Sequence, residues 1–325
     1  MHVQGARLDL LALAVGFVAL TLWIRTVRWQ HLLAPIGPTR FRTVFRAGVI
    51  GFAALAILPA RIGDLLRPYL VARRDGLPVS ATLATIVMER VLDLIAVLAL
   101  MALYVWGFAD TSAWNQALLA PIEASAAAGG ALSIALMVVM WVLASHPERI
   151  GRFVHAAAWL LPRTLAHRLG ELASTFSAGF AVARSPKGLF LSMFWSVPLW
   201  LIIAAETWAV TAAFGIDMSF TGSFLLQAML VVGVAVPTPG GVGSFHEAYR
   251  LGVTTFFGAP NDQAVAAAIV VHFLAFVPVL LLGVLFMVQD GLSLGSLAAL
   301  AGRARAEERE AEESDEVPVL RPSRR

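Results

Sequence analysis

The chain has 325 residues, of which 59% are hydrophobic and only 14% are charged, with a formal net charge of +3 and no cysteine. Soluble domains carry about 25% charged residues, so this composition excludes an ordinary soluble protein and indicates a polytopic membrane protein. The lack of cysteine excludes disulfides, iron–sulfur clusters and thiol catalysis.

The first predicted span covers residues 8–26, because about 20 apolar residues are needed to cross a bilayer. A group of arginines then begins near its end: Arg25, Arg28, Arg40, Arg42 and Arg46. Loops rich in arginine face the cytoplasm by the positive-inside rule. The N-terminus is therefore predicted to lie outside the cell.

A first interrupted segment follows. Residues 47–58 are apolar but too short to cross, and arginines flank them on both sides. This pattern predicts a re-entrant hairpin that enters from the cytoplasm, breaks at residues 59–63 and returns through residues 65–71. Arg61, Asp64 and Arg67 lie at this break and are candidate site residues.

The next predicted span, residues 80–106, carries Glu89, Arg90 and Asp93 in its first half. Each charge in an apolar span costs on the order of 2.5–3.5 kcal/mol unless it pairs or lines a cavity. Glu89 and Asp93 are four residues apart and share a helix face, with Arg90 offset from it. Pairing with Arg61 or Arg67 and contact with a substrate both remain open for them.

The middle of the chain is predicted to connect two units. Residues 107–125 lack lysine and arginine and are predicted to lie outside, and residues 129–144 are predicted to span back. Residues 147–187 alternate apolar and basic residues at helical spacing, which predicts helices lying in the cytoplasmic interface. A further span, residues 188–214, holds Glu206 deep inside it without a local partner.

A second break interrupts the apolar run at residues 220–257. Two prolines and three glycines within residues 237–243 prevent a continuous helix. Broken backbone at membrane depth is tolerated only where protein or a water-filled cavity satisfies it, and such breaks point to transporter binding sites. Both flanks lack lysine and arginine, so this hairpin is predicted to enter from the opposite membrane face.

Residues 263–288 form the last predicted span and end in the cytoplasm. His272 in this span could pair with Glu206 or Glu247, or serve the structure alone. Residues 291–325 are rich in arginine and glutamate and are predicted to form a disordered cytoplasmic tail.

The two hairpins match by position. Pro59-x-x-Ile62-Gly63-Asp64 aligns with Pro239-x-x-Val242-Gly243-Ser244, and Tyr69 and Tyr249 each follow their proline by ten residues. Chance is the alternative, since proline and glycine are common in membrane helices. We expect a membrane domain over residues 1–290, made of an inverted repeat with units at 8–106 and 188–288 joined by a connector at 107–187.

Four motifs together resemble a known family: Arg25-x-x-Arg28-Trp29-x-x-Leu32-Leu33, Leu58-Pro59-Ala60-Arg61-Ile62-Gly63-Asp64-x-x-Arg67, Glu89-Arg90-Val91-Leu92-Asp93 and Pro237-Thr238-Pro239-Gly240-Gly241-Val242-Gly243-Ser244. The family is the flippase-like membrane region of the lysylphosphatidylglycerol synthases, also called multiple peptide resistance factors, in its stand-alone form. The resemblance implies an integral inner-membrane protein that moves or handles anionic or isoprenoid-type lipids. The sequence departs from the family pattern at Asp64, where many relatives have Glu, and at His272, where Arg is expected. A short charged tail also stands where the synthases carry their aminoacyl-transferase domain, so no synthase activity is expected.

The chain is therefore predicted to be an all-α polytopic protein with about five full spans and two oppositely oriented re-entrant hairpins. We expect it to translocate or bind an anionic or isoprenoid-type lipid across the bacterial inner membrane, in a groove between the hairpins. Arg61 and Arg67 would hold the phosphate, because guanidinium groups bind phosphate through paired hydrogen bonds. Asp64 and Glu247 would meet cationic headgroup parts or the opposing arginines. The candidate substrate-binding residues are Arg61, Asp64, Arg67, Glu89, Arg90, Glu206, Pro239, Gly240, Gly241, Gly243, Ser244, Glu247 and His272.

Two alternatives stay open: a transporter of a soluble anion, and a non-catalytic membrane partner of an envelope lipid or glycan synthase. No catalytic constellation, metal-ligand cluster or nucleotide-binding loop is recognisable, so neither enzyme activity nor a cofactor or metal is expected. The expected partners are membrane lipids and not nucleic acid, with a second copy of the chain or an envelope synthase as protein partners to consider.

Overall fold

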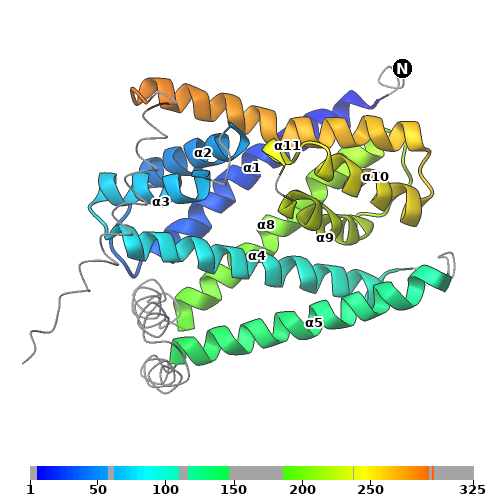
Figure 1. The fold of residues 1–325 in the computed structure, drawn as a ribbon, viewed down its shortest axis with the longest axis horizontal. Coiled ribbons are helices and arrows are strands. Elements are labelled where there is room, and N and C mark those ends of the chain that lie inside the picture. The colour runs from blue at the N-terminus through cyan, green and yellow to red at the C-terminus, as the bar shows by residue number, and fades with distance from the viewer. Residues whose placement is uncertain are drawn as a thin grey trace, which may run out of the picture.

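The computed structural model describes residues 6–57, 62–109, 116–145, 186–236, 238–292 and residue 295. These ranges contain helices and no strand (Figure 1). The elements are α1 (Leu8–Leu33), α2 (Phe41–Ile57), α3 (Ile62–Asp75), α4 (Val79–Gly107), α5 (Gln116–Ser145), α8 (Pro186–Ala213), α9 (Gly222–Ala235), the short 3-10 helix η5 (Pro239–Gly241), α10 (Ser244–Phe257) and α11 (Asn261–Gln289).

The long helices have the composition of membrane-spanning segments. Within the described ranges, α1, α11 and the Phe190–Ala213 part of α8 are long and apolar enough to cross a bilayer. Only 11% of the most apolar stretch of α11 is buried inside the protein. Water would solvate such a surface poorly, so its natural surroundings are lipid chains.

Two helical hairpins lie at the places where the sequence predicted breaks. The first pairs α2 with α3, and the second pairs α9 with α10. Their helices have 17, 14, 14 and 14 residues, each shorter than the roughly 20 residues of a full span. Gly63 permits the close approach within the first hairpin, since a Cβ there would lie 2.1 Å from the carbonyl oxygen of Gly51.

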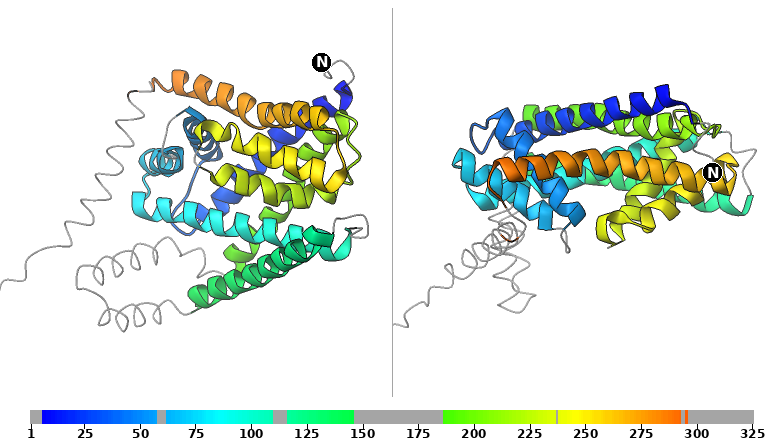
Figure 2. Two further views of the ribbon diagram at one scale, coloured as in Figure 1. Left: turned by 45° about the vertical axis from the view of Figure 1, so that its right-hand side comes forward. Right: turned by 90° about the horizontal axis from the view of Figure 1, so that it is seen from above.

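Helices α1 and α8 form the most extensive packing contact in the described part of the bundle, and they run antiparallel (Figure 2). At one end the backbone nitrogen of Arg7 donates to the carbonyl oxygen of Ala213, at 3.0 Å. Towards the other end, the rings of Trp23 and His31 both contact the ring of Trp195. Helices α1 and α8 therefore run in opposite directions along each other.

The remaining contacts follow a two-fold pattern around this pair. Each contact of the first hairpin has a counterpart in the second. The contact of α2 with α11 corresponds to that of α9 with α4, and the contact of α3 with α4 corresponds to that of α10 with α11. The contacts of α1 with α2 correspond to those of α8 with α9. Helices α1–α4 and α8–α11 thus make corresponding contacts. Helix α5 lies at the edge of the bundle against α4 (Figure 2).

The two hairpins meet at their tips, where η5 contacts α2. A Cβ on Gly240 would lie 3.6 Å from the carbonyl oxygen of Ala56. Gly240, Gly241 and Gly243 have φ values of 60°, 74° and 90°, which other residues adopt only with strain. The glycines of the second break thus supply a tight turn that contacts the first hairpin.

Several predicted boundaries differ from the helices. Helix α1 continues to Leu33, so Arg25 and Arg28 lie within it and not in a loop after it; the charge of Arg28 is offset by an ion pair with Asp93. Helix α5 starts at Gln116, inside the stretch predicted as a loop up to residue 125. The predicted interfacial helices at 147–187 fall almost entirely outside the described residues, and so does the predicted tail beyond residue 295.

Candidate functional site

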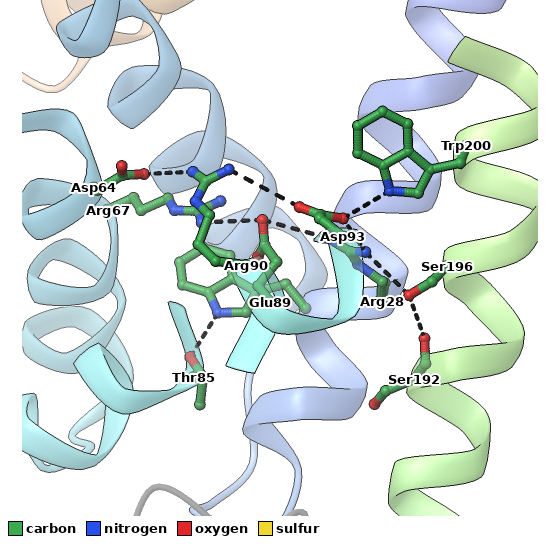
Figure 3. Close-up of polar contacts among 11 residues, drawn as sticks. Arg28, Asp64, Arg67, Thr85, Glu89, Arg90, Asp93, Ser192, Ser196 and Trp200 are labelled. Atoms are coloured by element: carbon green, nitrogen blue, oxygen red, sulfur yellow. Dashed lines mark hydrogen bonds and ion pairs between the residues drawn. The ribbon is translucent and has the colours of Figure 1, made fainter. Parts of the chain in front are cut away.

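A buried ion-pair cluster joins α1 to α4 (Figure 3). Arg28 is fully buried, and its Nη1 lies 2.6 Å from Oδ1 of Asp93. Its Nη2 lies 3.4 Å from Oε1 of Glu89. Trp200 on α8 donates its indole N–H to the same Asp93 oxygen at 3.0 Å, and Arg28 also donates to Oγ of Ser196 at 3.1 Å. The cluster therefore fixes three helices to one another.

The cluster extends to the first hairpin through α3 (Figure 3). Arg67, only 2% exposed, donates to Oε1 of Glu89 at 3.1 Å. Arg90 donates to Asp64 at 2.7 Å and lies 3.9 Å from Asp93. Of the pairings considered for Glu89, that with Arg67 is the one observed; Arg61 lies outside the described residues.

Breaking such a pair is expensive, because an uncompensated buried charge costs about 3–5 kcal/mol. Glu89 and Asp93 therefore hold the helices together, and they are not free to contact a substrate in this structure. Asp64 likewise pairs with Arg90. The sequence analysis assigned Arg28 to a cytoplasmic loop and to a family motif, and it missed the central role of this residue in the cluster. The signal for it was the buried face of α1, which carries Ala14, Val18, Thr21 and Arg28 at helical spacing.

A small pocket lies beside the cluster, between α1, α2 and Arg67 of α3. Arg25 and Arg67 both line it, and their guanidinium carbons lie 5.4 Å and 5.2 Å from the ring centroid of Phe52. Arg67 also lies over the ring of Trp29, at 5.0 Å. Aromatic rings next to guanidinium groups lower the cost of holding them in an apolar site.

The two arginines of this pocket retain unused hydrogen-bonding capacity. Arg25 makes no hydrogen bond or ion pair in the described part of the chain. The Nε of Arg67 is buried and has no hydrogen-bond partner there. Buried donors normally find acceptors, so the unpartnered Nε of Arg67 beside the unpaired Arg25 favours a place for an anionic ligand.

The charges around the pocket do not balance. Among the described residues, the four guanidinium groups of Arg25, Arg28, Arg67 and Arg90 face three carboxylates, those of Asp64, Glu89 and Asp93. One positive charge is left over, and Arg25 is the arginine without an ion pair. The pocket is therefore electropositive.

At the second hairpin, His272 holds the tip from α11. Its Nε2 lies 2.8 Å from the carbonyl oxygen of Gly240, and its ring contacts those of His246 and Phe276, with centroids 4.6 Å and 4.4 Å away. The expectation that His272 pairs with Glu206 or Glu247 does not match this geometry. The broken backbone left a carbonyl oxygen that needed a partner, and the imidazole lies next to it.

The other candidates of the second hairpin serve local contacts. Ser244 lies with its hydroxyl 3.0 Å from that of Thr238 across the break. Glu247 forms an ion pair with Arg250 on the same helix, and Arg250 also donates to Asn261 at 2.9 Å. Pro239 opens η5, and Gly240, Gly241 and Gly243 supply the turn. Within the described ranges, Glu247 pairs with Arg250, while Arg67 of the first hairpin pairs with Glu89.

Glu206 lies apart from the cluster, on α8. It is 5% exposed, and its Oε1 has no hydrogen-bond partner among the described residues. Its neighbour Thr207 instead accepts a hydrogen bond from Gln227 of α9, at 2.7 Å. The prediction of a deep carboxyl group without a local partner matches this arrangement.

The fold and the buried charges define a helical membrane protein with an electropositive pocket. A sequence profile described as "Lysylphosphatidylglycerol synthase TM region" matches residues 2–283, nearly the whole chain. The chain therefore belongs to this family, and the resemblance drawn from its motifs is confirmed.

Two relatives with names illustrate the range of the family. The chain is 26% identical over 275 residues to a "UPF0104 membrane protein" of Methanothermobacter thermautotrophicus, covering 81% of this chain and 78% of that one. It is 23% identical over 348 residues to "Glycosyltransferase AglD" of Haloferax volcanii, covering 97% of this chain but only 54% of that protein. The chain thus spans about half the length of the glycosyltransferase. No solved structure matches it.

Proposed function

We propose that this protein binds the phosphate of an anionic lipid headgroup in the pocket between Arg25 and Arg67, and moves the lipid between the two leaflets. The observation that carries the proposal is that two guanidinium groups lie over Phe52, that of Arg25 without an ion pair and that of Arg67 with an unpartnered Nε, in a membrane protein of a family named for a lipid synthase. Guanidinium groups match the geometry of phosphate oxygens and bind them with paired hydrogen bonds.

The lining of the pocket places the guanidinium groups of Arg25 and Arg67 beside apolar and aromatic side chains. The phosphate of the headgroup would lie against these guanidinium groups, and the acyl chains would stay in the bilayer. The large apolar side chains exposed on α8 and α11, such as Phe194 and Leu281, would face those chains. The lipid chemistry is either that of an anionic phospholipid or that of an isoprenoid-type phosphate, since both carry the same group to the pocket.

The proposal includes a topology. Helices α1, α4, α5, α8 and α11 would span the bacterial inner membrane, with the N-terminus outside and the C-terminus cytoplasmic. The hairpins α2–α3 and α9–α10 would re-enter from opposite faces and meet at midplane. The contact of η5 with α2 and the antiparallel packing of α1 on α8 support this arrangement. Movement of the tips against each other would open the pocket to one leaflet and then the other.

The proposal is of a non-enzymatic protein. The described residues hold no cluster of three metal-ligating side chains, and the buried carboxylates Glu89 and Asp93 are engaged with arginines. The name of the Haloferax relative favours one second candidate: a membrane partner that presents a lipid to an envelope lipid or glycan synthase. Such a partner would bind lipid in the same pocket without moving it.

Binding and movement are tested separately. The purified protein is titrated with dioctanoyl phosphatidylglycerol, dioctanoyl phosphatidylcholine and sulfate, and its thermal unfolding is followed. We expect stabilisation by phosphatidylglycerol that is lost in Arg25→Gln and kept in Arg7→Gln, whose exposed arginine pairs with Asp9 far from the pocket. Equal stabilisation of the Arg25→Gln variant overturns the proposed site. Stabilisation by sulfate alone would favour a soluble-anion transporter.

The movement of lipid is measured with fluorescent phosphatidylglycerol in vesicles that contain the protein. We expect the label in the inner leaflet to become accessible to an impermeant quencher. Full lipid binding without such exchange would support the partner of a synthase and would contradict translocation.

A further inference from the structure

A group of exposed arginines, called the basic rim here, lies where α2 begins and where α3 and α11 end. Its members are Arg40 and Arg42 at the start of α2, and Arg73 and Arg74 at the end of α3. The side chains of Arg40 and Arg42 make no hydrogen bond or ion pair in the described part of the chain. Two exposed guanidinium groups of the rim can therefore meet an acidic partner.

The carboxylates at this end of α2, α3 and α11 are already engaged. Asp75 accepts a hydrogen bond from the backbone N–H of Arg40, at 3.1 Å. Asp290 lies 2.7 Å from Arg46 and 2.6 Å from Arg74. The four arginines of the rim and Arg46 thus face two carboxylates, which leaves three positive charges over among the described residues of this end.

The tail of the chain holds its most acidic stretch, called the acidic segment here. Residues 307–316 contain seven of the 21 acidic residues of the chain and one arginine, which gives a net charge of −6. Blocks of like charge repel one another and often serve as interaction segments. The acidic residues are Glu307, Glu308, Glu310, Glu312, Glu313, Asp315 and Glu316.

The structure places the start of this tail on the basic rim. Asp290 is held there by its two ion pairs. The backbone nitrogen of Leu292 donates to the carbonyl oxygen of Met287 at 2.8 Å, and the side chain of Leu292 packs against a hydrophobic cluster shared by α2 and α3. The C-terminal end of α11, in orange, accordingly lies on the same side of the bundle as α3 (Figure 1).

The tether between the rim and the acidic segment is short. Residues 293–306 separate Leu292 from the segment, and a chain of this length spans at most roughly 50 Å when it is fully extended. A tether of this kind holds the segment near the rim at an effective concentration on the order of millimolar.

We propose that the basic rim is the docking surface of the acidic segment of the same chain. A single exposed ion pair contributes little, so the contact depends on several charges acting together and on the short tether. Docking offsets the surplus positive charge of the rim and weakens its attraction for anionic headgroups in the adjacent leaflet. The inference goes beyond the pocket and does not require an anion at Arg25.

The tether and the charge favour this occupant over two others. The acidic segment of a second copy would have to reach the rim from solution, and association then costs translational and rotational freedom. Anionic phospholipid headgroups would bring one net negative charge each, whereas the acidic segment brings six on one chain.

The test uses the rarity of lysine in this sequence. Lys187, at the start of α8, is its only lysine, so a carbodiimide, which joins carboxylates to amines without a spacer, has few targets. The full chain with Arg42→Lys, which keeps the charge at an exposed position, is treated in detergent, and linked peptides are identified by mass spectrometry. We expect links from position 42 to the acidic segment. The control Arg7→Lys, at the exposed start of α1, should give few links to this segment.

The electrostatic origin of the contact is tested on the same links. Their yield should fall several-fold between about 0.1 M and about 1 M salt, because the Debye length shortens from about 10 Å to about 3 Å. Adding Arg40→Gln and Arg73→Gln to the Arg42→Lys chain should also lower the yield several-fold. Adding Arg250→Gln, which removes an arginine of the second hairpin, should leave it unchanged.

Four results would overturn the proposal. The first is an equal yield from Arg42→Lys and Arg7→Lys, or a yield that does not change with salt. The second is linking of the acidic segment to Lys187 alone, which places the segment elsewhere. The third is linking between isotopically labelled and unlabelled chains in a mixed sample, which assigns the rim to a second copy.

The fourth concerns lipid. Links that form in phosphatidylcholine vesicles but disappear in an equal mixture of phosphatidylcholine and phosphatidylglycerol would assign the rim to lipid headgroups. Links that persist in this mixture support docking of the acidic segment. Each of these results leaves the proposed binding of lipid in the pocket standing, because that binding is measured at Arg25.

Discussion

The guanidinium groups of Arg25 and Arg67 lie over the same aromatic ring, 5.4 Å and 5.2 Å from the centroid of Phe52. Arg25 lies on α1 and Arg67 on α3, with α2 between these helices in the chain. Only Arg67 has a carboxylate partner, which is Glu89. Two cations near one ring repel each other, and an anion between them would relieve that repulsion. This relationship is the basis of the proposed headgroup site.

The ring itself should contribute to affinity. Phe52→Leu keeps an apolar side chain but removes the aromatic face, and a cation–π contact is worth about 0.5–2 kcal/mol. We expect phosphatidylglycerol binding to weaken by about 2- to 30-fold, which is that energy expressed as an equilibrium constant. Titration of intrinsic fluorescence or thermal shift measures the change. Phe190→Leu, at a 68%-exposed position of α8, is the matched control and should bind normally.

The ion-pair cluster should respond in a different way, through stability. Arg28→Gln leaves Asp93 buried without its cation, which should destabilise the fold by about 3–5 kcal/mol. Asp93→Asn in the same chain should recover much of this loss, because the uncompensated charge is then removed. Unfolding in detergent by heat or denaturant measures both. Equal stability of the single and double variants would show that Arg28 and Asp93 are not coupled.

Much of the helical layout could be predicted from the sequence, because its signals are local. Proline and glycine at residues 59–63 and 237–243 mark the two breaks, and the long apolar runs mark the spans. The site could not be predicted in the same way, because its partners lie far apart in the chain. Arg28 and Asp93 are 65 residues apart, and Arg28 and Ser196 are 168 apart. The first span was also predicted to end too early. An arginine in an apolar run indicates the end of a span unless its ion-pair partner, which lies far away in the chain, is known.

Two glycine variants distinguish the effect of backbone strain from the effect of contact between the hairpins. Gly240→Leu imposes φ near 60°, at a cost of about 1–2 kcal/mol, and places a side chain beside Ala56 of the first hairpin. Gly258→Leu imposes a similar φ of 62° at a position with no atom within 4 Å of the new Cβ. We expect both variants to insert and fold with similar loss of stability, but only Gly240→Leu to stop lipid movement in vesicles. Loss of movement in both would mean that backbone strain, and not contact between the tips, is responsible.

The proposed topology predicts opposite accessibility for two loops. The chain has no cysteine, so single cysteines can be introduced directly. Asn261 begins α11, after the second hairpin, and Asp75 ends α3 of the first hairpin. A cysteine at position 261 should react with an impermeant maleimide in intact cells, and one at position 75 only after permeabilisation. Reaction of both from one side would contradict hairpins that enter from opposite faces.

The most direct test locates the bound headgroup. A phosphatidylglycerol analogue with a photoreactive group on its glycerol headgroup is added to the purified protein in detergent, irradiated, and mapped by mass spectrometry. We predict labelling of residues that line the pocket on α1 and α2, including Leu22 and Phe45, competed by unmodified phosphatidylglycerol and absent in Arg25→Gln. Labelling confined to the outer faces of α5 or α11, or unchanged in Arg25→Gln, would contradict a headgroup site between Arg25 and Arg67.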